Sequence, residues 1–403
     1  MSKLEKLIAE LCPNGVEYKA LSNICELITK GTTPKRYEDS GVRFIKIENI
    51  TDSKIANTKM TFISDTTHNG ELKRSILKEN DIIFGIAGAL GKCAIVENEV
   101  LPANTNQALA IIRLRSDVNI KYIFYSLQAN SMVKYIEKNV KGSAQPNLNL
   151  QQLGDFSIPL PPLPIQREIV RILDNFTELT AELTAELTAR KKQYNYYRDE
   201  LLTFGDDVPM VTLGEVVFFT NGKAHENDIV VNGKYIVVNS KFISTNGQVS
   251  KYADKQICPV YRNDILMVMS DLPNGQALAK CYLVSSDNKY TLNQRICSLR
   301  IKNENETTSK FLHYILNRNE QLLSYNNGTD QTNLKKDQVL GILIPLPTLA
   351  EQERIVAILD RFDALTTDIS SGLPAEIAAR KKQYEYYRDR LLMFNKLLKE
   401  QRD

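Results

Sequence analysis

One stretch of fifteen residues occurs twice in this chain. It is written RKKQYNYYRDELLTF at residues 190–204 and RKKQYEYYRDRLLMF at residues 380–394, with twelve positions identical. The stretches before them also match, because IPLPPLPIQREIVRILDNFTELT (158–180) and IPLPTLAEQERIVAILDRFDALT (344–366) share fourteen of 23 residues. Fainter matches continue upstream, as between NDIIFGI from residue 80 and NDILMVM from residue 263. The 403-residue chain is therefore a tandem duplication of a unit of roughly 190 residues.

Each copy has two parts that differ in how similar they are. The first part, about 145 residues, has diverged strongly, and the last part, about 50 residues, has hardly changed. Since both copies share one history, we expect the similar parts to do the same job and the diverged parts to do different jobs. Two copies are too few for a solenoid, in which each repeat needs neighbours to bury its faces. Each copy is therefore expected to fold on its own.

The similar parts have the apolar spacing of long helices that pack against another helix. From Ile169 apolar residues alternate three and four positions apart. Leu179, Leu183 and Leu187 of the TAEL repeats add a four-residue step, which locally unwinds a supercoil. The second copy has the same spacing, with a break expected at SSGLP. A helix over residues 165–204 would be about 60 Å long, and we expect the two long helices to pack antiparallel.

The surface of these helices has two interpretations. Tyrosines at helical spacing are most simply core residues, and the RKK and YYRD charges a solvated face. The alternative is a docking surface for a partner protein, because the two copies differ so little on the polar side as well. The residues predicted to set the spacing or to dock a partner are Leu179, Leu183, Leu187, Arg190, Tyr194, Tyr197, Arg380, Tyr384 and Tyr387.

The diverged parts are predicted to be mixed α and β. Short apolar runs such as DIIFGIAG and ALAIIRL indicate strands, and IKYIFYSLQANSMVKYI indicates one amphipathic helix. The stretch GIAGALGKC (85–93) does not fit a phosphate loop, since Ile86 stands where the Walker spacing needs glycine and Cys93 replaces the Ser or Thr. No hydrolase, zinc-protease or kinase signature occurs, so the sequence offers no catalytic constellation.

Composition narrows the class of protein without naming a ligand. The net charge of +3 neither demands nor excludes nucleic acid. The six cysteines contain no CxxC pair and the three histidines lie far apart, which argues against a zinc site or a disulfide framework. With no apolar signal core and no run of eighteen apolar residues, the protein is expected to be cytoplasmic and to have no membrane partner.

Binding by loops is the function that remains for the diverged parts. Lys and Arg suit phosphates and guanine, Asn and Gln suit adenine, and glycines let a backbone approach closely. Residues of these kinds cluster in loops of both copies. Those predicted to contact DNA are Lys30, Thr32, Thr33, Lys35, Arg36, Lys46, Asn104, Asn106, Gln107, Lys141, Ser143 and Gln145 in the first copy, and Asn221, Lys223, Asn239, Lys241, Asn293, Gln294, Arg295, Thr329 and Gln331 in the second.

Several of these motifs together resemble the specificity subunit of type I restriction-modification systems. They are the duplication itself, GSAQPNL leading to IPLPPL, the helix start QREIVRILDNF, the TAEL repeat and RKKQYNYYRD. The similarity covers the whole chain and is greatest to the type IC-like subfamily, whose central spacer carries TAEL repeats. The resemblance implies an α+β fold in which two α/β target-recognition domains, a pseudo-two-fold tandem duplication, are separated by a pair of long antiparallel coiled-coil helices. The domains would be residues 1–157 (first target-recognition domain), 158–204 (central helical spacer with TAEL repeats), 205–343 (second target-recognition domain) and 344–403 (C-terminal helical region).

The resemblance also implies a function and partners. Each recognition domain would read one half of a bipartite, asymmetric target in double-stranded DNA. The helices would set the spacer length, through the number of TAEL units, and dock two methyltransferase (modification) subunits, which motor-nuclease (restriction) subunits would join. The chain would be non-catalytic and hold no cofactor, with S-adenosylmethionine, ATP and magnesium bound by the partner subunits.

Two other classes of protein are alternatives to a specificity subunit. A coiled-coil adaptor or scaffold that joins two proteins without touching DNA would show no salt-dependent DNA binding in the presence of a methyltransferase partner. A methyltransferase or nuclease in its own right would be active as the isolated chain. DNA binding and the activity of the separate chain therefore distinguish the three classes.

Overall fold

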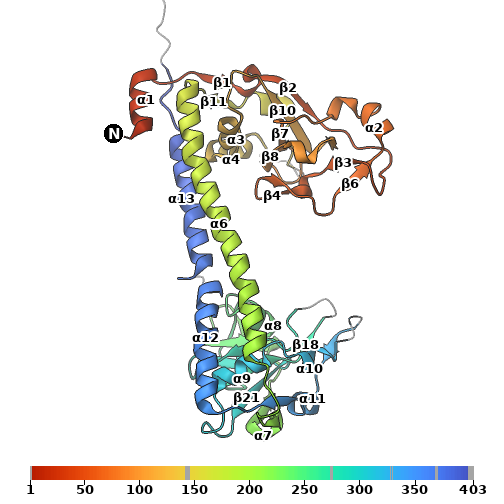
Figure 1. Cartoon of the computed structure of the whole chain (residues 1–403), viewed down its shortest axis with the longest axis vertical. Helices are drawn as coiled ribbons and strands as arrows, with labels where there is room; N and C mark the ends of the chain where they lie inside the picture. The colour runs from red at the N-terminus through yellow and green to blue at the C-terminus, as the bar shows by residue number, and fades with distance from the viewer. Residues whose placement is uncertain are drawn as a thin grey trace, which may run out of the picture. The chain divides into compact units, whose positions relative to one another are not determined.

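The structure is a computed structural model that describes residues 2–140, 146–272, 276–326, 328, 330–367 and 371–397. The chain forms two compact units (Figure 1). Unit 1 contains Met1–Ala185 and Glu376–Asp403, and unit 2 contains Glu186–Ala375. Each unit therefore takes its helical part from both copies of the repeat.

The elements of unit 1 are α1 (Lys3–Leu11), β1 (Tyr18–Ala20), β2 (Cys25–Lys30), β3 (Val42–Ile45), β4 (Ile50–Thr51), β5 (Lys54–Ile55), β6 (Thr61–Ile63), α2 (Asp65–Asn69), β7 (Ile82–Gly85), β8 (Cys93–Ile95), β9 (Ala103–Thr105), β10 (Leu109–Leu114), α3 (Ile120–Gln128), α4 (Asn130–Asn139), α5 (Leu150–Gly154) and β11 (Ser157–Pro159). Two helices cross the boundary between the units, namely α6 (Leu163–Leu201) and α13 (Leu373–Leu391).

The elements of unit 2 are β12 (Met210–Thr212), α7 (Leu213–Val216), β13 (Val217–Asn221), β14 (Ile229–Val230), β15 (Tyr235–Val238), α8 (Ser240–Ser244), β16 (Lys251–Ala253), β17 (Ile265–Val268), β18 (Ser270–Asp271), β19 (Cys281–Leu283), β20 (Tyr290–Leu292), β21 (Ile296–Ile301), α9 (Ser309–Leu316), α10 (Glu320–Leu323), β22 (Thr332–Asn333), α11 (Lys336–Leu340), β23 (Leu343–Pro345) and α12 (Leu349–Thr367).

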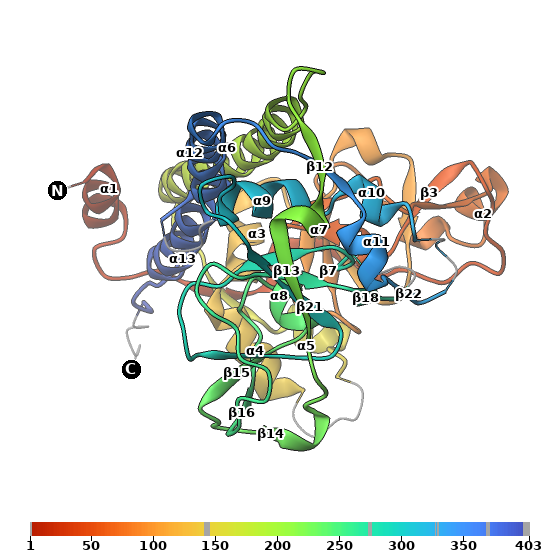
Figure 2. The same ribbon diagram turned by 90° about the horizontal axis from the view of Figure 1, so that it is seen from below.

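Both units are built on the same antiparallel sheet. Its strand order is β2-β10-β7-β8 in unit 1 and β13-β21-β17-β19 in unit 2. The middle strands β7 and β17 are continuous apolar runs that are buried along their whole length, as expected for strands covered on both faces. A second sheet holds one parallel pair, β3 with β9 in unit 1 and β15 with β20 in unit 2. In unit 2 the strands β14, β15 and β16 lie on the side away from α12 (Figure 2). The predicted mixed α and β fold, present twice in tandem, is confirmed.

The sheet of each unit contains an equivalent ion pair whose carboxylate is buried. Asp81 and Asp264 are both 1% exposed, and each accepts two hydrogen bonds, of 2.7–2.8 Å, from Arg113 and Arg300 respectively. The hydrogen bonds to these carboxylates raise the pKa of both arginines. Bidentate pairing satisfies the buried charge of each carboxylate, so these groups are not free for chemistry.

The first diverged part departs from the prediction of a single amphipathic helix. The stretch forms α3 and α4, because Ala129 between them has an extended backbone with ψ of 156°. The second copy is likewise divided into α9 and α10, with Arg318 at φ +63° between them and Asn319 capping α10. The extended Ala129 ends α3 and the left-handed Arg318 cannot continue α9, so each predicted helix is divided into two.

The predicted long helix is confirmed as α6, which has 39 residues and runs unbroken from unit 1 into unit 2. At a rise of 1.5 Å per residue it is about 58 Å long. Its start is held by Gln166, which is 2% exposed, donates to Pro161 O at 2.7 Å and accepts from Asn119 N at 3.1 Å. Gln352 does the same for α12, with bonds to Pro347 O (2.9 Å) and from Thr308 N (3.0 Å).

The second copy is broken where the sequence predicts. Helix α12 ends at Thr367 and α13 begins at Leu373, with Ser371 and Gly372 outside both helices. Within unit 1 the α6 segment lies beside α13 and runs antiparallel to it (Figure 1). Tyr18 of β1 donates to Phe394 O at 2.8 Å, so the end of α13 lies at the strand that pairs with β11, just before α6 begins.

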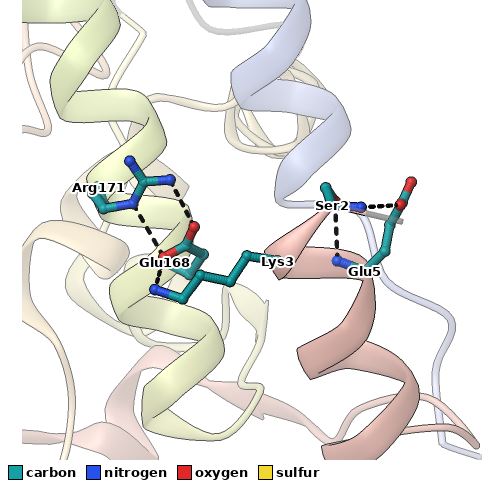
Figure 3. Close-up of polar contacts among 5 residues, drawn as sticks. All are labelled: Ser2, Lys3, Glu5, Glu168 and Arg171. Atoms are coloured by element: carbon teal, nitrogen blue, oxygen red, sulfur yellow. Dashed lines mark hydrogen bonds and ion pairs between the residues drawn. The ribbon is translucent and has the colours of Figure 1, made fainter.

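An extra helix, α1, precedes the first copy. Its Leu4 is buried in the core of unit 1, and Lys3 Nζ lies 2.8 Å from Glu168 Oε2 on α6, where Arg171 also donates (Figure 3). Ser2 and Glu5 cap the helix reciprocally. Hydrogen bonds from Arg171 and Lys3 lower the pKa of Glu168, which is 4% exposed, to about 2.

The substitution Glu168→Gln is expected to lower the melting temperature by a few degrees at neutral pH, because charged hydrogen bonds are lost. Since the folded pKa is depressed, the contribution is complete above the unfolded pKa of about 4.3 and is lost as the pH falls towards about 2. Thermal melts from pH 7 down to 2.5 measure this. Glu351→Gln, at the exposed pair with Arg354 on α12, is the matched control and should change little. An equal melting temperature for Glu168→Gln at neutral pH would contradict the assignment.

No helix in the described ranges is long and apolar enough to cross a membrane.

Candidate nucleic-acid interface

In unit 1 a glycine brings two predicted loops together. Gly31, directly after β2, donates from its N to Leu109 O at 3.2 Å, and Thr32 N donates to Thr105 O at 3.1 Å. A Cβ on Gly31 would lie 2.0 Å from Thr105 O, so only glycine permits this approach. The exposed residues Lys30, Thr32 and Thr33 therefore lie beside Asn106 and Gln107, and the Thr33 hydroxyl donates to Gln107 Oε1.

Two further segments join the same place through backbone hydrogen bonds. Ile86 N donates to Ala108 O, and Leu148 N donates to Ile86 O, both at 2.9 Å. The glycine-rich stretch after β7 is thus a loop beside the Asn106 turn, and Gly88 in it has φ of +75° and open space around its Cα. The predicted residues Lys141, Ser143 and Gln145 lie outside the described residues, just before this segment.

The carboxyl ends of two parallel strands also meet here. Lys46 follows β3 and Asn106 follows β9, and these strands pair in parallel up to Ile45 and Thr105. The Lys46 ammonium lies 4.6 Å from the centre of the Tyr37 ring, in a cation–π contact. Lys35 and Arg36 are exposed on the loop before Tyr37. Unit 1 therefore brings most of its predicted residues to one end of the sheets. We call this group of loops the loop cluster of unit 1.

Unit 2 repeats the arrangement with different side chains. Gly222 N donates to Ile296 O at 3.0 Å, Lys223 N to Leu292 O at 3.0 Å, and a Cβ on Gly222 would lie 2.0 Å from Asn293 O. Met269 N donates to Arg295 O at 2.9 Å, and Leu334 N to Met269 O at 2.8 Å. The loop cluster of unit 2 thus gathers Asn221, Lys223, Asn293, Gln294, Arg295 and Gln331, whose Nε2 donates to Ser270 Oγ at 2.7 Å.

Two predicted residues of unit 2 lie at the neighbouring strand end. Asn293 N donates to Val238 O at 3.1 Å, so Asn239, after β15, lies beside the turn. The Asn239 side chain accepts from Phe242 N at 2.9 Å and caps α8, and Lys241 is exposed in the first turn of that helix. The Asn239 side chain therefore has a structural role as the N-cap of α8. Thr329 lies outside the described residues.

The prediction that Asn104 contacts DNA is wrong. Its side chain is 0% exposed, donates to Leu72 O at 2.9 Å and pairs with His68 Nδ1 at 2.5 Å. The equivalent position in unit 2, Thr291, is also fully buried and bonds His225 at 2.8 Å. These buried polar pairs satisfy one another inside the sheet and cannot reach a ligand. The signal in the sequence was that Asn104 lies within a strand, three residues before the exposed Gln107.

The tyrosines predicted to dock a partner also make packing contacts within each unit. Tyr197 stacks on Phe362 in unit 2 with ring centres 5.7 Å apart, and Tyr387 stacks on Phe176 in unit 1 at 5.4 Å. Tyr194 and Tyr384 pack against the cores, and burial raises the pKa of both to about 12. Tyr194 and Tyr384 are therefore half-buried core-packing residues, whereas Tyr197 is 38% and Tyr387 36% exposed, and docking of a partner through this group stays a prediction.

The two arginines and three leucines predicted to dock a partner or set the spacing make contacts within their own helices or lie half-buried on them. Arg190 and Arg380 each donate to a glutamine three residues later, at 2.9 and 3.1 Å. Leu179, Leu183 and Leu187 are half-buried along α6. At the end of the repeated segment Leu392 lies in the core of unit 1, with Leu391 and Phe394 packed against that core, and Leu201, Leu202 and Phe204 pack against the core of unit 2. Each copy of the segment thus closes the core of one unit.

A surface that the sequence analysis missed is present on both copies. Tyr196 is 65% exposed and Tyr386 59%, and the lysines four residues before them, Lys192 and Lys382, are exposed as well. We call these four residues the shared stripe. The exposed neighbours Asn195 and Glu385, by contrast, differ between the copies. These four positions lie outside the apolar spacing and yet are identical in the two copies, and this identity could have identified the stripe from the sequence.

Among the described residues no group of three or more His, Cys, Asp or Glu side chains could hold a metal ion. All six cysteines are buried free thiols, and burial raises the pKa of each. Such thiols are poor nucleophiles.

Comparison with known proteins points to one class. The family model described as type I restriction modification DNA specificity domain matches residues 13–190 and 205–379. A type I restriction enzyme specificity subunit of Escherichia coli is 37% identical over 304 residues, which cover 69% of this chain and 71% of the relative. The chain belongs to the family of type I restriction-modification DNA specificity domains, as the resemblance predicted.

Solved structures agree on the fold. A chain from work on the assembly and conformational transition of the type I R-M system has a TM-score of 0.65 and 18% identity, and the match covers 95% of this chain and 98% of that one. The S subunit of a type I R-M system from M. genitalium has a TM-score of 0.51 and 15% identity, with 94% and 96% covered.

Proposed function

We propose that this chain is the DNA sequence-specificity subunit of a type I restriction-modification complex. Residues 1–157 and 205–343 are its target-recognition domains, and each reads one half of a bipartite, asymmetric target. The observation that carries the proposal is the pair of loop clusters. Their backbones are held by the same hydrogen bonds, whereas their exposed side chains differ. One scaffold with two different surfaces suits a reader of two unequal half-sites.

The loop clusters have the chemistry of DNA contact. Lys30 and Lys223 suit phosphates, while exposed Gln107 and Gln294 offer the amide that pairs with adenine. Gly31 and Gly222 hold the loops close together without side chains of their own. The exposed predicted residues of both clusters therefore remain our candidates for contact with double-stranded DNA.

Catalysis belongs to partners in this proposal. Two methyltransferase subunits bind S-adenosylmethionine and methylate DNA, motor-nuclease subunits bind ATP and magnesium, and this chain holds no cofactor. The complex works on cytoplasmic DNA. The shared stripe, one copy in each unit, offers equal docking sites to two identical subunits.

The spacing between half-sites is set by residues 158–204 and 344–403. Leu179, Leu183 and Leu187 of the TAEL repeats lie in the part of α6 that passes from unit 1 into unit 2. We assign the chain to the TAEL-repeat subfamily on this ground.

Exchanging residues 1–150 for the corresponding part of another family member is expected to change one half-site and leave the other half-site and the spacing untouched. Modification-sensitive sequencing of host DNA reads the methylated motif directly. The reciprocal exchange of residues 205–343 is the matched control, and it should change the other half only. If either exchange altered both halves, the two domains would not read DNA independently.

A further inference from the structure

The turn after β9 and the turn after β20 are the same structure with one exposed difference. Asn106 Oδ1 accepts from Ala108 N at 3.1 Å, and Asn293 Oδ1 accepts from Arg295 N at 3.3 Å. The carbonyls of Ala108 and Arg295 each accept a hydrogen bond of 2.9 Å from the strand end beside them. The side chains of residues 108 and 295 therefore leave equivalent backbone positions.

The residues before them are identical. Gln107 and Gln294 are both exposed, and each follows the asparagine that closes the turn. Since backbone and neighbour match, residues 108 and 295 stand out as an isolated difference between the two turns. An exposed Arg stands in unit 2 where unit 1 has a half-buried Ala.

Arg295 differs from the structural arginines of its unit. Arg300 is held by Asp264 at 2.7 Å, and Arg318 donates to Gln276 O and Leu278 O at 3.1 and 3.2 Å. Within the described part of the chain the Arg295 guanidinium has no ion pair or hydrogen bond. Its five donors are thus available to a ligand, and the fork geometry fits the O6 and N7 acceptors of guanine.

Resting on the function proposed above, we propose that residues 108 and 295 are equivalent specificity-determining positions. Arg295 selects guanine at one step of the half-site read by unit 2. Ala108 presents only a methyl group, so unit 1 does not select guanine at the corresponding step of its half-site. The inequality of the two half-sites thus depends in part on a single side chain.

The test uses the complex reconstituted with its methyltransferase subunits and a library of DNA duplexes in which each half-site is randomised in turn. Arg295→Ala is expected to lower the preference for guanine at one base pair by about 10- to 100-fold and to leave the other half-site unchanged. Arg295→Lys should keep a weaker preference for the same base. Ala108→Arg should add a guanine preference to the half-site of unit 1, provided its melting temperature matches that of the wild type.

Lys223→Ala is the matched comparison, because Lys223 is an exposed cation of the same loop cluster. It should weaken methylation evenly over all sequences and reduce the salt slope by about one. The inference is overturned if Arg295→Ala also acts evenly on all sequences, which marks a phosphate contact, or changes no base preference. A wild-type complex that methylates no bipartite motif would instead contradict the proposed function itself.

Discussion

A chain with one more TAEL unit, inserted after Leu187, is expected to recognise the same two half-sites at a longer spacing. Four residues lengthen α6 by about 6 Å and rotate the downstream part of the helix by about 40°. Along B-DNA, where base pairs are about 3.4 Å apart, this corresponds to one or two more unread base pairs. The insertion lies among half-buried and exposed helix positions, outside both cores. Modification-sensitive sequencing of DNA from cells that carry the variant measures both properties at once.

Two control insertions separate length from sequence. Four alanines at the same place should give the same new spacing, because they keep the helix and its rise. Four glycines should abolish a defined spacing, since they break the helix. An altered half-site, or an unchanged spacing with four helical residues added, would contradict a helix that measures the target.

Removing both tyrosines of the shared stripe is expected to abolish assembly with the methyltransferase subunits. Exposed aromatic side chains that dock in a partner are often hot spots, whose truncation weakens binding by about 30-fold or more. Tyr196→Ala alone or Tyr386→Ala alone should leave complexes with one methyltransferase subunit, because each unit carries one copy. Native mass spectrometry of the purified complexes counts the subunits directly.

The chain supplies its own control for this experiment. Asn195→Ala with Glu385→Ala changes exposed neighbours that differ between the copies, and the stoichiometry should remain two methyltransferase subunits per chain. Two bound subunits in the Tyr196→Ala, Tyr386→Ala double variant would show that docking uses another surface.

Much of the architecture could be predicted from patterns in the sequence. The duplication predicts two units of one fold, and the three-four spacing predicts α6 to within a few residues. The stretch SSGLP predicts the break before α13 in the second copy. These features are local or periodic, and therefore one chain suffices to find them.

The features that sequence reasoning missed depend on long-range packing. Asn104 and Asn106 are both asparagines in one polar stretch, but the partner of Asn104 is His68, which lies far away in the sequence. Similarly, the tyrosine pattern identifies a helix face without saying which residues cover it. Phe362 and Phe176 cover that face, and so Tyr196 and Tyr386, which lie off it, remain exposed.

The most direct test of a role in DNA specificity is modification-sensitive single-molecule sequencing of host DNA with this gene present and with it deleted, the partner genes left intact. A specificity subunit predicts that methyladenine at one split motif is lost on deletion and returns when the gene is restored. An unchanged methylation map, with expression of all subunits confirmed, would contradict a specificity subunit and favour an adaptor that never reads DNA.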